Sequence, residues 1–381
     1  MILKNENNCV LFLFFVLLYI LVIIMTEKIK ETEIWDYLKA TDLPIVLYGM
    51  GNGADMIIDV LNEIGKEPQA VFASDGFVRG HTFHGMKVLT LKEVEEKFKE
   101  FIILLTFAVH DKSMLRYLKD LSEKHLLLSP TVPIAGKGLF TYELILKHND
   151  DFDFAYTLLA DEQSKKVFTD VLNFKISGKI AYLFDCETDK SEVYTDILKP
   201  DENECFVDLG AYDGDTIREF TEFTKGKYDK IFAFEPDEKN YKKLCKKIDG
   251  YENIEAYNLG AWDKEEVLYF EKKGGRNSRK SDNINVKSIP VCFNSVDNII
   301  NNNVSILKMD IEGAESKALD GAYNTIKRCT PKLYICAYHR NEDFFELIKK
   351  IHSFNPDYKI YLRHHPYIPA WETNIYAVAD K

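Results

Sequence analysis

The sequence predicts an α/β fold with two units, each built on a mostly parallel sheet that helices cover on both faces. Short apolar strands alternate with helical stretches along most of the 381 residues, and each half opens with a strand, a glycine-rich turn and a helix. A chain of this length is long for one domain and sufficient for two.

The first unit is expected between residues 40 and 150 and is the smaller, Rossmann-like one. An apolar strand at 43–48 enters the turn Gly49-Met-Gly-Asn-Gly-Ala54, and helical periodicity follows over 55–64. Its other strands are expected at 70–74, 87–89 and 101–106. The pattern breaks at His148-Asn-Asp-Asp-Phe-Asp.

The second unit is expected over residues 155–381. It begins with a helix at 156–172, and helices such as 237–248 and 342–351 separate most of its strands. Seven strands are expected, at 205–209, 230–234, 254–257, 305–309, 332–336, 358–362 and 374–378. The pattern predicts a seven-stranded sheet.

The turn after the first of these strands predicts a nucleoside-type ligand. Gly210 and Gly214 permit tight turning and close approach of a ligand to the backbone. The next strand ends at Glu235, 25 residues after Gly210, where a carboxylate can accept from both hydroxyls of a ribose.

The negative charge of this turn indicates which kind of nucleoside ligand it can bind. Asp208, Asp213 and Asp215 would repel a pyrophosphate, so a dinucleotide fits poorly. They suit a ligand that carries an ammonium and a sulfonium, which favours S-adenosylmethionine. The alternative is a structural turn in which Asp215 lies near a helix start.

The second unit resembles the FkbM family of methyltransferases. The stretches that carry the resemblance are FVDLGAYDGDT (206–216), FAFEPDEKNYKKL (232–244), ILKMDIEGAESKAL (306–319), AYHRNEDFFELIKKI (337–351) and ETNIYAV (372–378). The resemblance implies a class I methyltransferase fold, S-adenosylmethionine as cofactor, and transfer to a hydroxyl oxygen of a sugar, glycan or small metabolite.

The same resemblance implies the cofactor-binding residues. Those of the turn are Asp208, Gly210, Tyr212, Gly214 and Asp215. Glu235 is expected to hold the ribose, and Ala261 and Trp262 to flank the adenine, although Trp262 would serve equally as a core aromatic.

The predicted catalytic residues follow the fourth and fifth strands of this unit. Asp310 and Glu312 stand where ligands of doubly wound sheets lie, and Asp310 is the expected general base. His339 is the alternative base because its ordinary pKa is closer to neutral. No resident metal is expected, although Asp310, Glu312 and His339 could converge on a divalent cation. Oxygen is favoured over nitrogen as acceptor because no [DN]-P-P-[YFW] stretch occurs.

Two segments bear on the acceptor. Residues 272–287 (KKGGRNSRKSDNINVK) are either a solvated hairpin tip or a lid that meets an anionic acceptor such as a nucleotide sugar. Arg363-His-His365 is a second cationic point.

Composition excludes some classes of function. The net charge of −12 argues against broad nucleic-acid binding, and seven cysteines without a C-x-x-C pair indicate reduced thiols in a cytoplasmic protein. Residues 9–25 carry no charge. They are either a short membrane anchor or a stretch added by a translation start assigned too early. The sequence does not determine whether the protein forms an oligomer.

The first unit offers a competing function. Gly49-x-Gly-x-x-Ala54 after a strand, with Asp75 at the next strand end, is a dinucleotide fingerprint. It predicts an NAD-dependent oxidoreductase or sugar epimerase, but no Tyr-x-x-x-Lys pair accompanies it. The other expected roles of this unit are acceptor recognition, subunit contact or a scaffold without a ligand.

Overall fold

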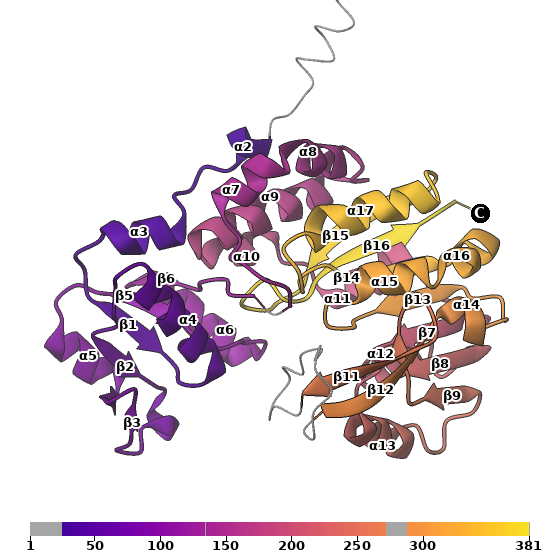
Figure 1. Cartoon of the computed structure of the whole chain (residues 1–381), viewed down its shortest axis with the longest axis horizontal. Helices are drawn as coiled ribbons and strands as arrows, with labels where there is room; N and C mark the ends of the chain where they lie inside the picture. Colours follow the sequence, from indigo (N-terminus) through magenta and orange to yellow (C-terminus); the bar gives the residue numbers. More distant parts are fainter. Residues whose placement is uncertain (1–24, 134, 272–287, 381) are drawn as a thin grey trace, which may run out of the picture.

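The computed structural model describes residues 25–133, 135–271 and 288–380, and it has the expected α/β architecture (Figure 1). The hydrophobic segment at 9–24 and the basic segment at 272–287 lie outside the described residues. No helix of the described residues is long and apolar enough to cross a membrane.

The first unit is a six-stranded sheet in the order β3-β4-β2-β1-β5-β6. Its strands are β1 (Ile45–Tyr48), β2 (Ala70–Phe72), β3 (Thr82–Phe83), β4 (Met86–Leu89), β5 (Ile102–Leu105) and β6 (Leu126–Leu128). The helices of this part are α2 (Met25–Lys28), α3 (Ile34–Ala40), α4 (Asn52–Glu63), η1 (Asp75–Phe77), α5 (Leu91–Lys97) and α6 (Lys112–Ser122). The central strands are buried along their whole length, which is why they read as unbroken apolar runs.

The second unit is a seven-stranded sheet in the order β15-β16-β14-β13-β7-β8-β9, and all seven expected strands are present. They are β7 (Cys205–Leu209), β8 (Lys230–Phe234), β9 (Ile254–Tyr257), β13 (Ile306–Met309), β14 (Lys332–Cys336), β15 (Lys359–His364) and β16 (Thr373–Val378). Only β16 runs antiparallel to its neighbours. The strand order reverses at β7, whose carboxyl end is therefore the switch point where ligands bind in such sheets.

Helices surround this sheet. They are α12 (Asp215–Phe223), α13 (Glu238–Lys247), α14 (Val296–Ile299), α15 (Glu315–Asp320), α16 (Tyr323–Cys329) and α17 (Asp343–Phe354). A small sheet that the sequence did not predict lies beside them, in the order β10-β12-β11. Its strands are β10 (Gly260–Ala261), β11 (Glu266–Glu271) and β12 (Ser288–Asn294).

Six helical segments lie between the two sheets in the chain; α7 to α10 also lie between them in space (Figure 1), while η2 packs against the second sheet. They are α7 (Tyr142–Lys147), α8 (Asn149–Thr157), α9 (Glu162–Ser177), α10 (Ala181–Cys186), α11 (Lys190–Glu192) and η2 (Val193–Leu198). The expected single helix over 156–172 was wrong at its start, because α9 begins after Asp161, whose side chain caps it by accepting from Ser164 N.

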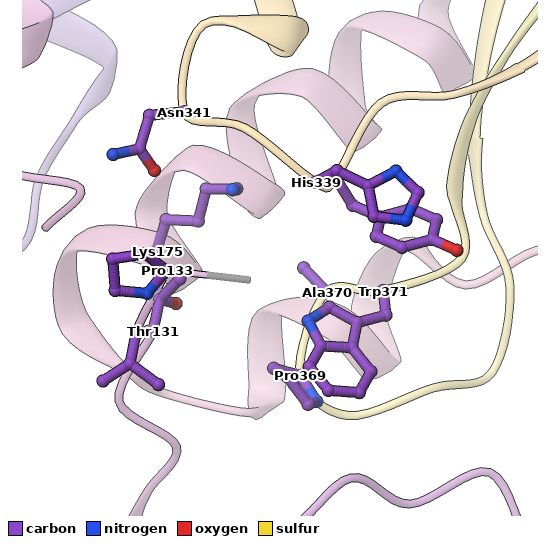
Figure 2. A pocket seen from close by; sticks show the side chains of 10 residues that line it. Thr131, Pro133, Lys175, His339, Asn341, Pro369, Ala370 and Trp371 are labelled. Carbon is purple, nitrogen blue, oxygen red and sulfur yellow. The ribbon is translucent and has the colours of Figure 1, made fainter. Parts of the chain in front are cut away.

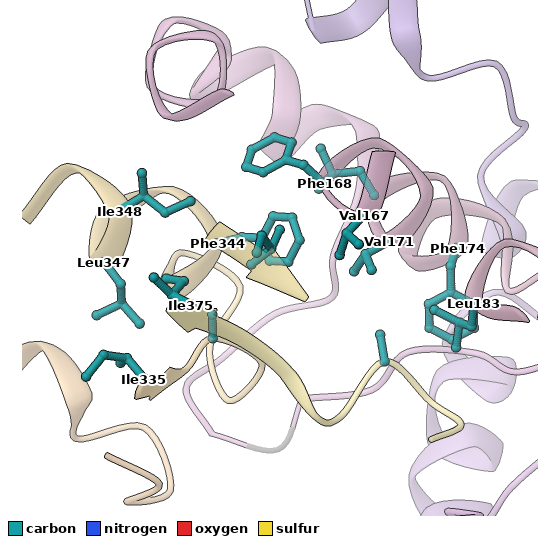
Figure 3. Close-up of a cluster of buried hydrophobic side chains, with 14 of the residues drawn as sticks. Val167, Phe168, Val171, Phe174, Leu183, Ile335, Phe344, Leu347, Ile348 and Ile375 are labelled. Atoms are coloured by element: carbon teal, nitrogen blue, oxygen red, sulfur yellow. The ribbon is translucent and has the colours of Figure 1, made fainter. Parts of the chain in front are cut away.

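Helix α9 joins these helices to the second sheet. Its apolar face, with Val167, Phe168 and Val171, packs toward Phe344 of α17 and Ile375 of β16 in one buried cluster (Figure 3). Burial of side chains of this size is worth roughly 1.5–3 kcal/mol each, so α9 is fixed firmly against the sheet. Any residue on α9 that faces the site is held with the same precision as the sheet itself.

Candidate functional site

The turn after β7 lies at the switch point. Gly210 has a φ of +81°, and a Cβ built on it would lie 1.8 Å from the carbonyl oxygen of Asp310, so no other residue fits. The amides of Gly210 and Ala211 donate to Phe234 O at 3.0 and 2.9 Å, which ties the turn to the end of β8. Gly214, with a φ of +86°, starts α12.

Asp208 lies beneath this turn rather than on its surface. Its carboxylate is fully buried, and the ammonium nitrogen of Lys308 is 3.0 Å from Oδ1. The two residues are register partners on β7 and β13. Lys308 also donates to Gly210 O at 3.3 Å, so one buried cation holds both the strand end and the turn.

The outer residues of the turn are exposed. Tyr212 has a φ of +45° and projects from the surface, with Lys243 over its ring at 5.7 Å. Asp213 pairs with Lys247 at 2.5 Å, and Asp215 accepts from Thr216 N at 2.8 Å as the first residue of α12.

Glu235 is the buried carboxylate that follows β8. It accepts from the amides of Tyr212 and Asp237 at 2.9 and 2.8 Å, and it is 6% exposed. Burial raises its pKa to about 7, because the charged form loses hydration that two backbone donors only partly replace. A ligand that donates hydroxyls to Glu235 would stabilise its charged form.

Ala261 and Trp262 lie at the small sheet. Ala261 is buried in β10, and the ring of Trp262 meets Phe293 edge to face at 5.7 Å. Asn258 donates to Glu235 O at 2.8 Å and so links this segment to the end of β8.

Asp310 and His339 meet at the ends of β13 and β14. His339 Nε2 is 3.5 Å from Asp310 Oδ1, and the hydroxyl of Tyr338 donates to the same oxygen at 3.1 Å. Glu312, with a φ of +55°, is exposed, but its carboxylate is 3.7 Å from His339 Nε2. The structure thus brings together all three predicted catalytic residues.

Glu315 is the site residue that the sequence did not reveal. It is fully buried in α15, and its carboxylate is 2.9 Å from His339 Nδ1. The amide of Ile311 also donates to this carboxylate at 3.0 Å. A buried carboxylate on the far side of the imidazole fixes the ring and favours its charged form.

The pKa values of this group follow from that arrangement. Burial alone would lower the pKa of His339, but Glu315, Asp310 and Glu312 together raise it to about 10. Burial opposes ionisation of Asp310, yet Lys308 and His339 hold the pKa of this carboxyl below its usual range. At neutral pH the site therefore carries an anionic Asp310 beside a cationic His339.

Asp310, Glu315 and His339 could also hold a metal, since ligand atoms of the three lie within 4.8 Å of one another. Glu315 can be a ligand only for an ion on the Nδ1 side of His339. An ion on Nε2 would leave Glu315 as the support of the imidazole and Asp310 as the remaining carboxylate of this set.

Two other sequence motifs have different surroundings from those expected. A Cβ on Gly49 would lie 2.5 Å from the ring of Phe107, so packing alone explains this glycine. The expectation that residues 363–365 form a cationic point was wrong. Arg363 pairs with Asp161 at 2.6 Å, and burial lowers the pKa of His364 to about 3 and that of His365 to about 4, which leaves both neutral.

A family model for the FkbM methyltransferase domain matches residues 208–368. This part of the chain is similar to an FkbM methyltransferase domain. The matched range begins at the buried Asp208 and includes Glu235, Asp310 and His339, so the residues described above lie inside the methyltransferase domain. A comparison with curated proteins found no match.

One solved structure supports the fold. An FkbM methyltransferase from Methylobacillus flagellatus is 23% identical, covers 93% of both chains and gives a TM-score of 0.67. This likeness extends over both units and supports the class I methyltransferase fold with its preceding Rossmann-like unit. An rRNA methylase from Streptococcus thermophilus is 14% identical over 48% of this chain and 89% of its own, with a TM-score of 0.33.

The match to the FkbM methyltransferase domain supports an S-adenosylmethionine-dependent methyltransferase. The site fits that cofactor on its own chemistry. Glu235 is a buried carboxylate that accepts from two backbone amides and has capacity for two further donors, such as the hydroxyls of a ribose.

Proposed function

We propose that the enzyme methylates a hydroxyl oxygen of a sugar, glycan or small metabolite and that Asp310 is the general base. The observation that carries the proposal is the pair formed by Asp310 and His339 at the switch point, 3.5 Å apart and oppositely charged. An acceptor hydroxyl must lose its proton during transfer, and Asp310 is the ionised oxygen base at this edge.

The raised pKa of His339 assigns it a different role. An imidazolium has no free lone pair, so at neutral pH His339 cannot accept the hydroxyl proton. It holds Asp310 ionised and oriented instead, with Glu315 behind it. The earlier alternative, His339 as base, is therefore not the one we propose.

The remaining residues of the site bind and position the cofactor in this proposal. Gly210 and Gly214 supply the positive φ angles that shape the turn, and Glu235 accepts from the ribose. Tyr212, Asp215, Ala261 and Trp262 border the same region. S-adenosylmethionine, when bound, supplies an electrophilic methyl group on a sulfonium.

Asp208 has a supporting role in this proposal. Because it is paired with Lys308 under the turn, it holds the turn in shape rather than meeting the ligand with a free charge. Its second oxygen, Oδ2, has no hydrogen-bond donor among the described residues.

The experiment is product analysis after turnover with S-adenosylmethionine labelled with ¹³C at the methyl group. A panel of free sugars, sugar phosphates and uronic acids serves as acceptors, and amines of the same size serve as controls. The proposal expects a product whose methyl carbon has the chemical shift of an O-methyl group. A methyl group found on nitrogen or carbon would contradict it.

A further inference from the structure

A pocket opens beside His339, between the two parts of the chain (Figure 2). One wall is the segment 131–133 after β6, and the opposite wall is the segment 369–371 before β16. Helix α9 contributes Lys175, and His339 and Asn341 border the side nearest Asp310. The pocket is shallow: its enclosed volume is about 20 Å³, and it widens into an open mouth. The first unit's exit segment thus shapes a space at the catalytic edge.

Lys175 is the unusual residue of this pocket. It is only 5% exposed, and no described residue accepts a hydrogen bond from its ammonium group. Figure 2 shows that group directed toward the space that His339 and Asn341 border. Its nearest described support is the ring of Phe140, 5.1 Å from Nζ.

Such a lysine is expensive for the fold. Burial lowers its pKa to about 8, against the opposing influence of the carboxylates of Asp343 and Glu342. An ammonium on so buried a side chain is costly unless a partner or water in the pocket accepts its hydrogen bonds. The residue is thus better explained by a ligand than by stability.

The rest of the pocket has the character of a binding site. The hydroxyl oxygen of Thr131 is buried and lacks a partner among the described residues. On the opposite side, Pro369 and the indole of Trp371 present a flat apolar face (Figure 2). A few polar groups facing an aromatic wall are typical of sites for small polar ligands.

We propose that this pocket binds the methyl acceptor and that Lys175 binds an anionic group of that acceptor, a carboxylate or a phosphate ester. The inference rests on the proposed function, which puts the acceptor hydroxyl at Asp310. His339 borders the pocket and is 3.5 Å from Asp310, so a molecule in the pocket reaches the catalytic edge. The proposal gives the first unit a role in acceptor recognition.

Calorimetry on the full chain tests the proposal. The protein is first saturated with S-adenosylhomocysteine and then titrated with inorganic phosphate, glucose 6-phosphate, glucuronate and glucose. We expect the charged probes to bind more tightly than glucose. The tighter binder of the phosphate and carboxylate probes then identifies the anionic group of the acceptor. In Lys175→Met, the affinity for that probe should fall by about 10- to 100-fold, the usual loss for a hydrogen bond to a charged group.

Two comparisons separate binding from folding. Lys166→Met on the same helix removes an exposed lysine paired with Asp170 and should leave probe binding unchanged. Lys175→Met should have a melting temperature equal to or above that of the wild type, because it removes an unpaired buried charge. If the methionine variant does not fold, Lys175→Gln replaces it with the same expected loss.

The outcomes distinguish this inference from the function beneath it. Failure of S-adenosylhomocysteine to bind would contradict the proposed function. Normal cofactor binding with no charged probe bound, or with equal probe affinity in Lys175→Met, would overturn the pocket assignment alone. A lower melting temperature with unchanged probe binding would make Lys175 a structural residue.

Discussion

The buried pair of Asp208 and Lys308 allows a quantitative test of how the cofactor turn is held. Replacing Asp208 with Leu keeps the shape of the side chain and removes its charge. Lys308, 3% exposed, then keeps only Gly210 O at 3.3 Å and the charge of Asp310 nearby. Removing one partner of a buried pair costs about 3–5 kcal/mol.

The remaining contacts of Lys308 place our expectation near the lower end, about 3 kcal/mol. For a domain of this size such a loss lowers the melting temperature by roughly 6–12 °C. Urea and thermal unfolding of Asp208→Leu, Lys308→Met and the double variant complete a double-mutant cycle. The double variant should recover most of the loss, because two apolar residues of similar volume often replace a buried pair without cost.

The result that would refute this reasoning concerns the ligand. Suppose that the unfolding free energy of Asp208→Leu lies within about 1 kcal/mol of the wild-type value, and yet the variant loses affinity for S-adenosylhomocysteine. Asp208 then acts on the cofactor rather than on Lys308. The turn would then be held by its glycines and the Phe234 carbonyl alone.

Three further predictions concern other groups. Glu235→Ala should weaken S-adenosylhomocysteine binding by about 1–3 kcal/mol in calorimetry, whereas Glu238→Ala, which removes an exposed carboxylate nearby, should not; equal affinities would remove Glu235 from the site. The pKa of His339 is raised to about 10, so its ion pairs stabilise the fold fully below the unfolded pKa of about 6.5 and progressively less as pH rises toward 10. The unfolding free energy of the wild type should therefore fall between these pH values, and that of His339→Gln should fall less. Parallel curves would show that the fold does not hold the imidazolium. NAD should bind the full chain weakly or not at all; micromolar binding that Gly51→Asp abolishes would restore the oxidoreductase interpretation.

The sequence predicted the fold and the edge on which the site lies. Alternating apolar strands gave all seven strands of the second sheet, and strand ends located Glu235, Asp310 and His339. The signal was strong because each of these residues interrupts or follows an apolar run at the same edge. The small sheet was missed because β10 has two residues and β12 is far from it in sequence.

Partners buried between elements were harder to predict. Glu315 and Lys175 lie on helices, where charged residues are ordinarily solvated, so nothing local marks them as buried. Lys308 had a usable signal, because a lysine in the apolar strand Ile306–Met309 must find an anion, and Asp208 occupies the equivalent place in β7. Pairing charges across expected neighbouring strands would have found it.

Single-turnover methyl transfer across pH, in the wild type, Asp310→Asn and His339→Gln, tests the central claim that Asp310 is the base of this methyltransferase. We expect Asp310→Asn to bind S-adenosylhomocysteine normally while its transfer rate falls by about 10²-fold or more, the usual scale for loss of a general base. His339→Gln should lose less. A near-wild-type rate in Asp310→Asn, together with loss in His339→Gln of a pH-dependent limb near 6.5, would contradict the account and assign the proton to His339.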